Sequence, residues 1–467
     1  MKKTKIICSI GPACDSFEVM SKMVSKGMDC ARFNLSHASH EDIIKTIDVV
    51  REVRKACNVP LAIMYDTKGP EFRTSKFKDG GVTLKKGDTI RMARNCIIGN
   101  EDEFAVNHSD AIELINVGDM VFIDNALFEL EVIDKKEDFL VLKALDNCKI
   151  QSNKTINVPG VDLKLDFISE VDKKDIAFAA RHSCDYLALS FVNTREDVIA
   201  AREIIRKAGG DSLIISKIES RIGIDNIDEI IDESDGIMVA RGDLGVEVSM
   251  EKLPMLPKEI ITKCREKGKF AIVATEMLAS MYESPRPSRA EVSDVANAVL
   301  DGTDCVMLSG ETTVGKYPVA SVEIMARICR YVESTVDYRK NVSYRGIIGI
   351  SDTIAKLVAD AVEYSDIKLI VTMTMTGFTA GKISNLRPNS TIMACCPSSH
   401  IAQRVALNFG VRPVITDIYG ATDKMIENAK NTAIKEFDLK KGDLIVITGG
   451  FPIGKSRMTN YLRIMEI

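Results

Sequence analysis

The stretch Leu213-Ile-Ile-Ser-Lys-Ile-Glu-Ser220 is a short apolar run that ends in a lysine, a glutamate and a serine. Residues two apart on a strand face the same side, so a strand here would project Lys217 and Glu219 together. A second run, Gly236-Ile-Met-Val-Ala-Arg-Gly-Asp-Leu-Gly245, ends in a similar way, with Asp243 near its end. Buried strands that end in charged side chains are typical of a parallel sheet with a site at the carboxyl ends of its strands.

Eight apolar runs of strand length share this pattern. They are Lys5–Ile10, Met28–Phe33, Leu61–Tyr65, Asp185–Phe191, Leu213–Ile218, Gly236–Ala240, Phe270–Ala274 and Asp304–Leu308. The polar residues at or just past their ends are Arg32 with Asn34 and Ser36, Asp66 with Thr67 and Lys68, Ser190, Lys217 with Glu219, Arg241 with Asp243, Thr275 with Glu276, and Ser309 with Glu311. Because the carboxyl ends of all strands in a (β/α)₈ barrel meet at one mouth, we predict an α/β protein with a TIM barrel and an enzyme site at that mouth.

Composition excludes several other classes of protein. The 467 residues suggest two to four domains, and the net charge of −5 with interspersed signs argues against nucleic acid or an anionic membrane as a partner. No apolar run approaches the roughly 18 residues of a membrane span, and the N-terminal residues lack the features of a signal peptide. The 12 cysteines show neither zinc-ligand spacing nor a Cys-x-x-Cys pair, so we expect reduced structural thiols and a cytoplasmic protein.

About 118 residues lie between the third and fourth predicted strands, too many for one helical crossover. Short alternating runs separated by turn residues predict a small inserted β-barrel here. These runs are Val82–Leu84, Thr89–Met92, Met120–Ile123, Glu129–Val132 and Phe139–Leu142. An insert that leaves and rejoins the barrel at its mouth is well placed to act as a lid. We therefore expect a catalytic barrel of residues 1–69 and 158–338, with a lid of residues 70–157.

Residues 339–467 are expected to form a separate C-terminal doubly wound α/β domain with a regulatory role, because predicted helices and strands alternate there. The predicted strands are Lys368–Thr372, Thr391–Cys395, Arg412–Thr416, Leu444–Thr448 and Leu462–Ile467, and the predicted helices are Ser351–Val362, Ala402–Phe409 and Asp423–Phe437. In the barrel, helical periodicity predicts helices over Asp42–Ala56 and Thr194–Ala208.

Lys217, Glu219 and Asp243 form the strongest chemical pattern. Lys217 and Glu219 taken alone also fit a structural ion pair. Two carboxylates from adjacent strand ends, with few other oxygen ligands nearby, suit a Mg²⁺ ion that keeps water and substrate ligands. Gly242 and Gly245 would let backbone amides approach an anion at the start of the next helix.

Together with several longer segments, these residues make the sequence resemble the pyruvate kinases over nearly its whole length. The matching segments are Thr4–Pro12, Gly27–His37, Asp66–Arg73, Ile215–Glu219, Met238–Val246, Pro285–Glu291, Ser293–Gly302 and Met307–Thr312. The resemblance implies phosphoryl transfer from phosphoenolpyruvate to ADP, which yields pyruvate and ATP in the last step of glycolysis. It also implies the barrel, lid and C-terminal domain described above, and a homotetramer.

The resemblance assigns roles to individual residues. Glu219 and Asp243 would hold Mg²⁺ or Mn²⁺, and Lys217 and Arg32 would bind the transferring phosphoryl group. Backbone amides of Gly242 and Asp243 would take the substrate carboxylate, and Thr275 would lie where the enol carbon is protonated. Arg73 and Lys154 would contact the nucleotide.

A potassium site is also implied. Its ligands would be Asn34, Ser36, Asp66 and Thr67. These are hard oxygen donors with a single negative charge, which suits K⁺. Glu71 resembles the residue of the K⁺-dependent members, while members with Lys at this position need no monovalent cation, so we predict dependence on K⁺.

Two departures and one further motif stand out. Glu276 occupies a position that is usually Gln, so either its side chain points away from the anionic substrate or its pKa is raised. Ser288 replaces a usual Thr. Gly449-Gly-Phe-Pro-Ile-Gly-Lys-Ser456 matches a P-loop, but only 11 residues follow it, and they predict a strand where a P-loop NTPase needs a helix.

This C-terminal region corresponds to the effector site of pyruvate kinases. A sugar phosphate or nucleotide effector would contact Thr374, Thr376, Gly377, Thr379 and Lys455. Met375 and Phe378 stand where the animal forms activated by fructose bisphosphate carry basic residues, so the identity of the effector stays open.

Two other functions fit parts of this pattern. A Mg²⁺-dependent carbon–carbon lyase on a similar barrel would need neither the lid nor its nucleotide contacts. A non-catalytic regulatory barrel would be expected to lack Lys217, Glu219 or Asp243, all of which are present.

Overall fold

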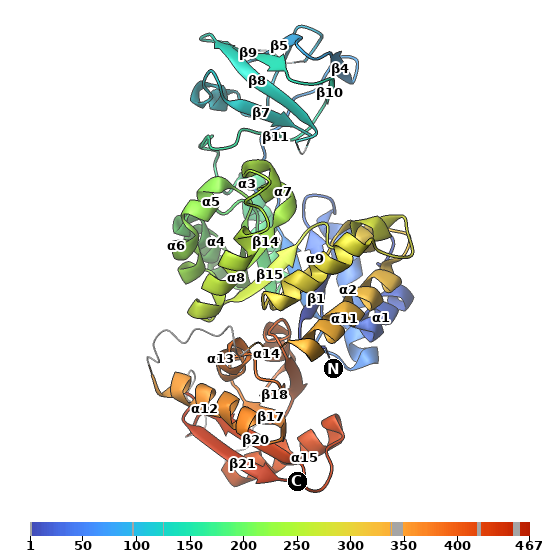
Figure 1. Cartoon of the computed structure of the whole chain (residues 1–467), viewed down its shortest axis with the longest axis vertical. Coiled ribbons are helices and arrows are strands. Elements are labelled where there is room, and N and C mark those ends of the chain that lie inside the picture. Colours follow the sequence, from blue (N-terminus) through green and yellow to red (C-terminus); the bar gives the residue numbers. More distant parts are fainter. Residues whose placement is uncertain are drawn as a thin grey trace.

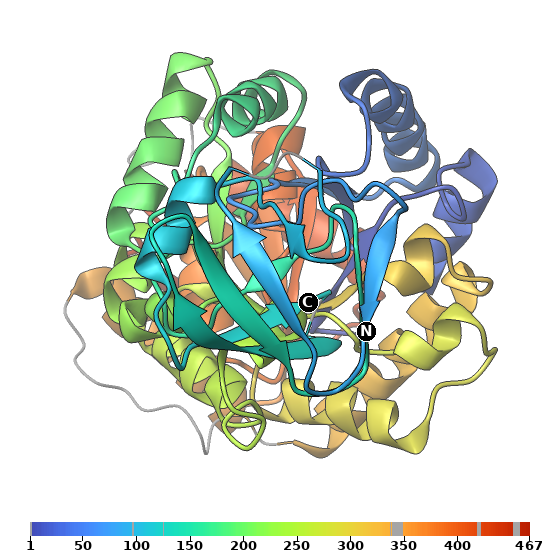
Figure 2. The same cartoon turned by 90° about the horizontal axis from the view of Figure 1, so that it is seen from above.

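The computed structural model describes residues 2–95, 98–124, 126–336, 338, 349–417, 422–451 and 458–467. Three units follow one another along the long axis of the molecule: an all-β unit, a barrel surrounded by helices, and an α/β unit (Figure 1). Seen along that axis, the all-β unit lies over the barrel (Figure 2). The described helices include none that is both long and apolar enough to span a membrane.

The central unit is a closed parallel barrel with the strand order β1-β16-β15-β14-β13-β12-β3-β2. Its strands are β1 (Lys5–Ser9), β2 (Cys30–Asn34), β3 (Ala62–Asp66), β12 (Tyr186–Leu189), β13 (Leu213–Ile218), β14 (Gly236–Ala240), β15 (Phe270–Ala274) and β16 (Cys305–Leu308). All eight predicted strands are confirmed. Met28, predicted to start the second strand, instead donates its N–H to the carbonyl of Met23 at 3.1 Å as the first helix ends.

Helices connect the strands on the outside of the barrel. They are α1 (Phe17–Lys26), α2 (His40–Cys57), α3 (Glu170–Arg181), α4 (Arg195–Lys207), α5 (Arg221–Asp225), α6 (Ile227–Glu233), α7 (Arg241–Glu247), α8 (Leu256–Lys267), α9 (Arg289–Leu300), α10 (Gly310–Thr313) and α11 (Pro318–Thr335), with a 3₁₀ turn η2 (Ala279–Tyr282). Ser288 forms a capping box with Glu291 at the start of α9. Serine and threonine both serve at such a cap, so this departure from the family pattern is structurally mild.

The inserted unit has its own hydrophobic core and two sheets, β10-β4 and β11-β7-β8-β9-β5-β6. Its elements are β4 (Gly81–Leu84), β5 (Thr89–Ala93), β6 (Glu103–Phe104), η1 (Ser109–Leu114), β7 (Met120–Ile123), β8 (Phe128–Lys135), β9 (Phe139–Ala144), β10 (Cys148–Gln151) and β11 (Ile156–Asn157). The five predicted strands are present. β6, β10 and β11 were not predicted; β6 and β11 have only two residues each, too few for an alternating pattern to be recognised.

The C-terminal unit is a five-stranded sheet of order β19-β18-β17-β20-β21, in which β21 is antiparallel to β20. Its elements are α12 (Ile350–Tyr364), β17 (Ile367–Met373), α13 (Phe378–Asn385), β18 (Thr391–Cys396), α14 (Ser399–Arg404), β19 (Val411–Ile415), α15 (Thr422–Phe437), β20 (Leu444–Gly449) and β21 (Tyr461–Glu466). The return of β21 antiparallel to β20 differs from a P-loop fold, in which the glycine-rich loop leads into a helix.

The predicted helix Ala402–Phe409 is wrong. α14 begins earlier, where Ser398 caps it by accepting from the N–H of Ile401 at 3.4 Å, and it ends at Arg404. The apolar residues Leu407 and Phe409 pack into the barrel cores instead of extending a helical stripe. The apolar residues in this stretch therefore reflect packing between two units and not a helix.

Arg387 joins the C-terminal unit to the floor of the barrel. Its guanidinium, fully buried, lies 2.9 Å from the carboxylate of Asp304 and donates to the carbonyl of Gly302 at 2.8 Å. The same group lies over the ring of Phe409 at 4.5 Å. Asp304 also accepts from the N–H of Ala271 at 2.9 Å.

Asp304→Ala would leave this guanidinium buried without a counter-charge, so we expect a loss of about 3–5 kcal/mol in the free energy of unfolding. The chain has no tryptophan, so urea unfolding is followed by circular dichroism. Asp366→Ala removes an exposed partner of Lys368 and serves as a control that leaves the midpoint unchanged. Equal midpoints for the two variants would contradict the structural role of Asp304.

The cysteines that the structure describes are all free, and most are buried. Burial raises the pKa of the Cys264 and Cys305 thiols above the usual value, which makes them poor nucleophiles. The predicted role as structural thiols is confirmed for the described cysteines.

Candidate active site

The carboxyl ends of the barrel strands and the underside of the inserted unit enclose a cavity of about 590 Å³. Ten of the residues expected to bind metal ions, substrate or nucleotide line it. They are Arg32, Asn34, Ser36, Asp66, Thr67, Arg73, Lys154, Lys217, Glu219 and Asp243. Gly242 and Thr275 lie beside this group without lining the cavity.

Asp66 is a buried carboxylate shared by two cations. The guanidinium of Arg32 donates to it at 2.6 and 2.7 Å, and the Nζ of Lys217 donates at 3.2 Å. Burial by itself would raise the pKa of Asp66, but Arg32 and Lys217 outweigh burial and hold that pKa below its usual value. The arrangement fixes two positive side chains at the mouth of the barrel.

Glu219 lies beside Lys217, with 2.9 Å between Oε1 and Nζ. Its other oxygen accepts from the N–H of Phe191 at 2.7 Å. Burial raises the pKa of Glu219 to about 7; Lys217 opposes this shift and the carboxylate of Asp243 adds to it. The negative charge on Glu219 is therefore only partly compensated by the protein.

Thr275 and Glu276 both have left-handed backbone conformations, with φ of 70° and 54°. Such a conformation is a genuine outlier for a β-branched residue and is found mainly at functional sites. The hydroxyl of Thr275 accepts from the N–H of Gly242 at 2.8 Å, which couples the two residues. Glu276 is exposed and does not line the cavity, which supports the first of its two interpretations, that the side chain points away from the substrate.

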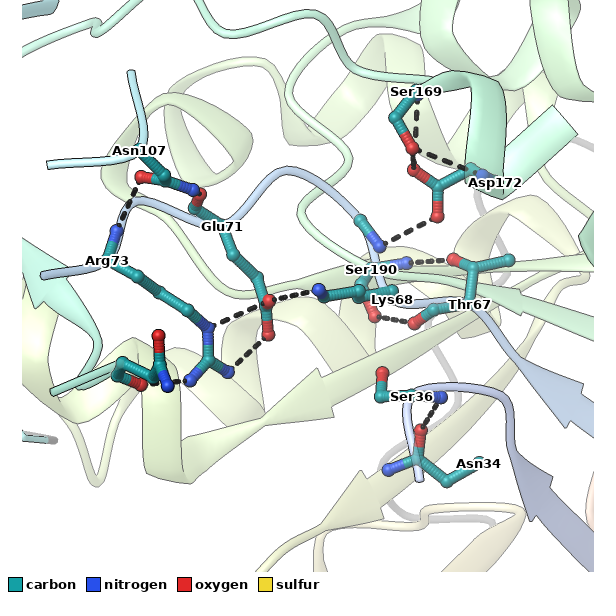
Figure 3. A network of polar contacts seen from close by, with 12 residues as sticks. Asn34, Ser36, Thr67, Lys68, Glu71, Arg73, Asn107, Ser169, Asp172 and Ser190 are labelled. Atoms are coloured by element: carbon teal, nitrogen blue, oxygen red, sulfur yellow. Dashed lines mark hydrogen bonds and ion pairs between the residues drawn. The ribbon is translucent and has the colours of Figure 1, made fainter. Parts of the chain in front are cut away.

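The four residues expected to bind K⁺ come from two adjacent strands. Asn34 on β2 pairs in register with Asp66 on β3, and Ser36 and Thr67 follow directly. The Oδ1 of Asn34 accepts from the N–H of Ser36 at 3.0 Å (Figure 3). All four residues line the same cavity.

Glu71 forms a two-pronged ion pair with Arg73, with contacts of 2.6 and 2.8 Å, and it also binds Lys68 at 2.9 Å (Figure 3). Lys154 is paired in a similar way with Asp124 at 2.8 Å. Both cations expected to contact a nucleotide are therefore held by carboxylates of the inserted unit or its entry segment.

The sequence matches the family model described as "Pyruvate kinase, barrel domain" over residues 1–322 and the one described as "Pyruvate kinase, alpha/beta domain" over residues 352–465. The chain belongs to the pyruvate kinase family. It is therefore a phosphotransferase that moves the phosphoryl group of phosphoenolpyruvate to ADP, the last step of glycolysis. The lyase and the non-catalytic barrel are set aside.

Individual relatives agree with this assignment. Pyruvate kinases of Staphylococcus epidermidis and Staphylococcus aureus are 41% identical over 99% of this chain and 80% of their own length. The crystal structure of a pyruvate kinase from Cryptosporidium parvum superposes with a TM-score of 0.94 at 37% identity, covering 100% of this chain and 96% of that one.

Ser190 at the end of β12 is a polar contact of this pyruvate kinase site to which the sequence assigned no role. Its hydroxyl accepts from the Nζ of Lys217 at 2.7 Å and donates to the carbonyl of Thr67 at 2.8 Å. Its position after a strand was visible in the sequence, but its partners were not, because they come from two other strands.

Glu247 at the end of α7 was missed as well. It lines the cavity and accepts from the Nδ2 of Asn157, on the returning edge of the lid, at 3.4 Å. Burial raises its pKa, and the contact with Asn157 opposes that shift.

The loop expected to bind an effector lies between β17 and α13. Thr374 and Thr379 are buried, and the N–H of Gly377 already donates to the hydroxyl of Thr374 at 2.9 Å. Thr376 is exposed. Lys455 lies outside the described residues.

Ser190→Ala would remove the hydroxyl that holds Lys217, and a hydrogen bond to a charged group is worth about 1.5–3 kcal/mol. We expect turnover to fall roughly 10- to 100-fold in the pyruvate-forming assay. Ser152→Ala is the control, because Ser152 lines the same cavity but its hydroxyl accepts from the N–H of Phe77 at 2.9 Å. Similar rates for both variants would contradict a positioning role for Ser190.

Proposed function

We propose that this phosphoryl transfer takes place in the cavity between barrel and lid, with a divalent cation held by Glu219 and Asp243. The observation that carries the proposal is the convergence of Arg32, Lys217 and these two carboxylates in one cavity. Phosphoryl transfer depends on positioning and charge stabilisation, which this set of charges supplies.

The residues fit a divalent cation. A buried carboxylate whose pKa is raised to about 7 lacks full compensation in the protein, and a cation shared with Asp243 would provide it. Among the described residues no cluster of three or more His, Cys, Asp or Glu could hold a metal, so Glu219 and Asp243 would leave positions for water and substrate oxygens. When bound, Mg²⁺ or Mn²⁺ would supply Lewis acidity at the enolate oxygen of the substrate.

The protein's own groups would bind and orient phosphoenolpyruvate. Arg32 and Lys217 would hold the phosphoryl group, and their shared partner Asp66 keeps both in place. Amides of Gly242 and Asp243 would take the carboxylate, for which the Gly242 N–H must leave the hydroxyl of Thr275. Thr275 would then hold a water near the enol carbon, which receives a proton.

ADP would bind between barrel and lid through Arg73 and Lys154. Both side chains are preorganised by Glu71 and Asp124, so a nucleotide phosphate would share or displace these ion pairs. Potassium would bind to Asn34, Ser36, Asp66 and Thr67, whose oxygens include one buried carboxylate.

Several wider features are proposed from the sequence pattern together with the family. We infer a homotetramer, a cytoplasmic location, and the domain limits 1–69 with 158–338, 70–157 and 339–467. A sugar phosphate or nucleotide would act as effector at Thr374, Thr376, Gly377, Thr379 and Lys455.

The first test measures pyruvate formation from phosphoenolpyruvate and ADP with Mg²⁺, in K⁺ and in Na⁺. We expect turnover in K⁺ to exceed that in Na⁺ by roughly tenfold or more, the effect of losing about 1.4 kcal/mol of transition-state stabilisation. Glu71→Lys should raise activity in Na⁺, because a lysine ammonium would take the place of the monovalent cation. Equal rates in the two salts would contradict the proposed potassium site but not the assignment as a pyruvate kinase.

The effector loop is tested separately with Thr376→Ala, since this hydroxyl is exposed. With fructose bisphosphate, glucose 6-phosphate and AMP as probes, we expect the variant to need about tenfold more of whichever compound activates the wild type. Basal activity should not change. An unaltered activation curve would count against this loop as the effector site.

A further inference from the structure

Asp172 is a buried carboxylate at the start of α3, to which neither the sequence nor the family comparison assigned a role. The residue is only 3% exposed. α3 follows the segment that returns from the lid, and Asp172 forms a capping box with Ser169 just before the helix. A capping box needs only one oxygen of the carboxylate.

The two oxygens of Asp172 bind the two segments that connect lid and barrel (Figure 3). Oδ2 accepts from the N–H of Ser169 at 3.1 Å and from its hydroxyl at 2.6 Å. Oδ1 accepts from the N–H of Gly69 at 3.1 Å. Because Gly69 lies on the outgoing segment, one side chain ties the exit from the barrel to the return.

Gly69 is confined on its other side by Ser190. It has a φ of 70°, and a Cβ at this position would lie 2.8 Å from the Cβ of Ser190. The hydroxyl of Ser190 in turn binds Lys217 at 2.7 Å and the carbonyl of Thr67 at 2.8 Å. The turn at Gly69 is thus fixed between Asp172 and the residues around the reacting phosphate.

Asp172 takes part in no ion pair within the described ranges of the chain; its charge is met by amides and a hydroxyl. Amides at a helix N-terminus stabilise a negative charge. Only a carboxylate can accept hydrogen bonds from both Gly69 and Ser169, because an asparagine presents one accepting oxygen and one donating nitrogen. The chemistry of the residue therefore matters, not only its size.

We propose that Asp172 is a positioning residue for the lid hinge. It holds the turn Thr67–Glu71 so that Thr67 faces the potassium position and Glu71 holds Arg73 toward the nucleotide. This inference rests on the proposed function for the roles of Thr67 and Arg73. Loss of the Asp172 carboxylate should weaken the binding of ADP and of K⁺. The binding of phosphoenolpyruvate should change little, because Arg32 and Lys217 are held by Asp66.

The test compares wild-type enzyme with Asp172→Ala and Asp172→Asn. For Asp172→Ala we expect the KM for ADP and the K⁺ concentration for half-activation to rise about tenfold, with the KM for phosphoenolpyruvate within threefold. Hydrogen–deuterium exchange should quicken about tenfold in the peptide that contains Gly69. Asp172→Asn can still accept from one of the two segments, so its KM values and exchange rate should lie between those of the wild type and of Asp172→Ala. This variant also tests the proposal if the alanine variant does not fold.

Asp175→Asn is the matched control. Asp175 is buried on the same helix one turn later and pairs with His40 at 2.7 Å. It should leave both KM values and exchange at Gly69 unchanged, whatever it does to the melting temperature.

The outcomes distinguish a failure of the hinge proposal from a failure of the proposed function. Unchanged exchange at Gly69 in Asp172→Ala, or equal kinetic changes in the Asp172 and Asp175 variants, would overturn the proposal. A wild-type enzyme that works equally in K⁺ and Na⁺ would remove only the potassium role of Thr67. The exchange rate and the KM for ADP would still decide whether Asp172 positions the hinge.

Discussion

The shared burial of Asp66 between Arg32 and Lys217 is the interaction on which the site depends. Two cations next to one another in a barrel mouth would repel and would be costly to desolvate. Asp66 compensates both from the end of β3, so the barrel backbone itself sets where the positive charges lie. Because breaking such a buried pair on one side leaves an uncompensated charge, none of these three residues can change independently of the others.

Contacts in the same region join the side chains at the barrel mouth to the segment that leads to the inserted unit. Ser190 touches both Lys217 and the turn at Gly69, and Gly69 touches Asp172. The segment that leads out to the inserted unit therefore begins within two hydrogen bonds of Lys217. The left-handed backbone of Thr275, across the mouth, adds a further rigid point that packed surroundings must maintain.

The barrel could be predicted because its buried strands are continuous apolar runs, and the charged residues at their ends marked the mouth. Lys217 and Glu219 were recognisable since residues two apart on a strand face the same side, and Asp243 because it follows the next strand along the chain, which pairs with theirs. Ser190, Glu247 and Asp172 were not, because their partners are distant in sequence and a serine after a strand or an aspartate in a capping box is common. Helix α14 was misplaced because apolar residues that pack between units imitate the stripe of a helix.

The pairing of β1 with β16 has a consequence for how the chain is made. Lys5 lies in register with Cys305, so the barrel cannot close until about two thirds of the protein has left the ribosome. In the part of residues 81–157 that the structure describes, the strands pair with one another and bury their own core, so that unit can fold much earlier. During synthesis the incomplete sheet of β1, β2 and β3 therefore keeps unpaired strand edges after the inserted unit has folded. The first part of the catalytic barrel to be translated is thus the part that spends longest exposed to aggregation.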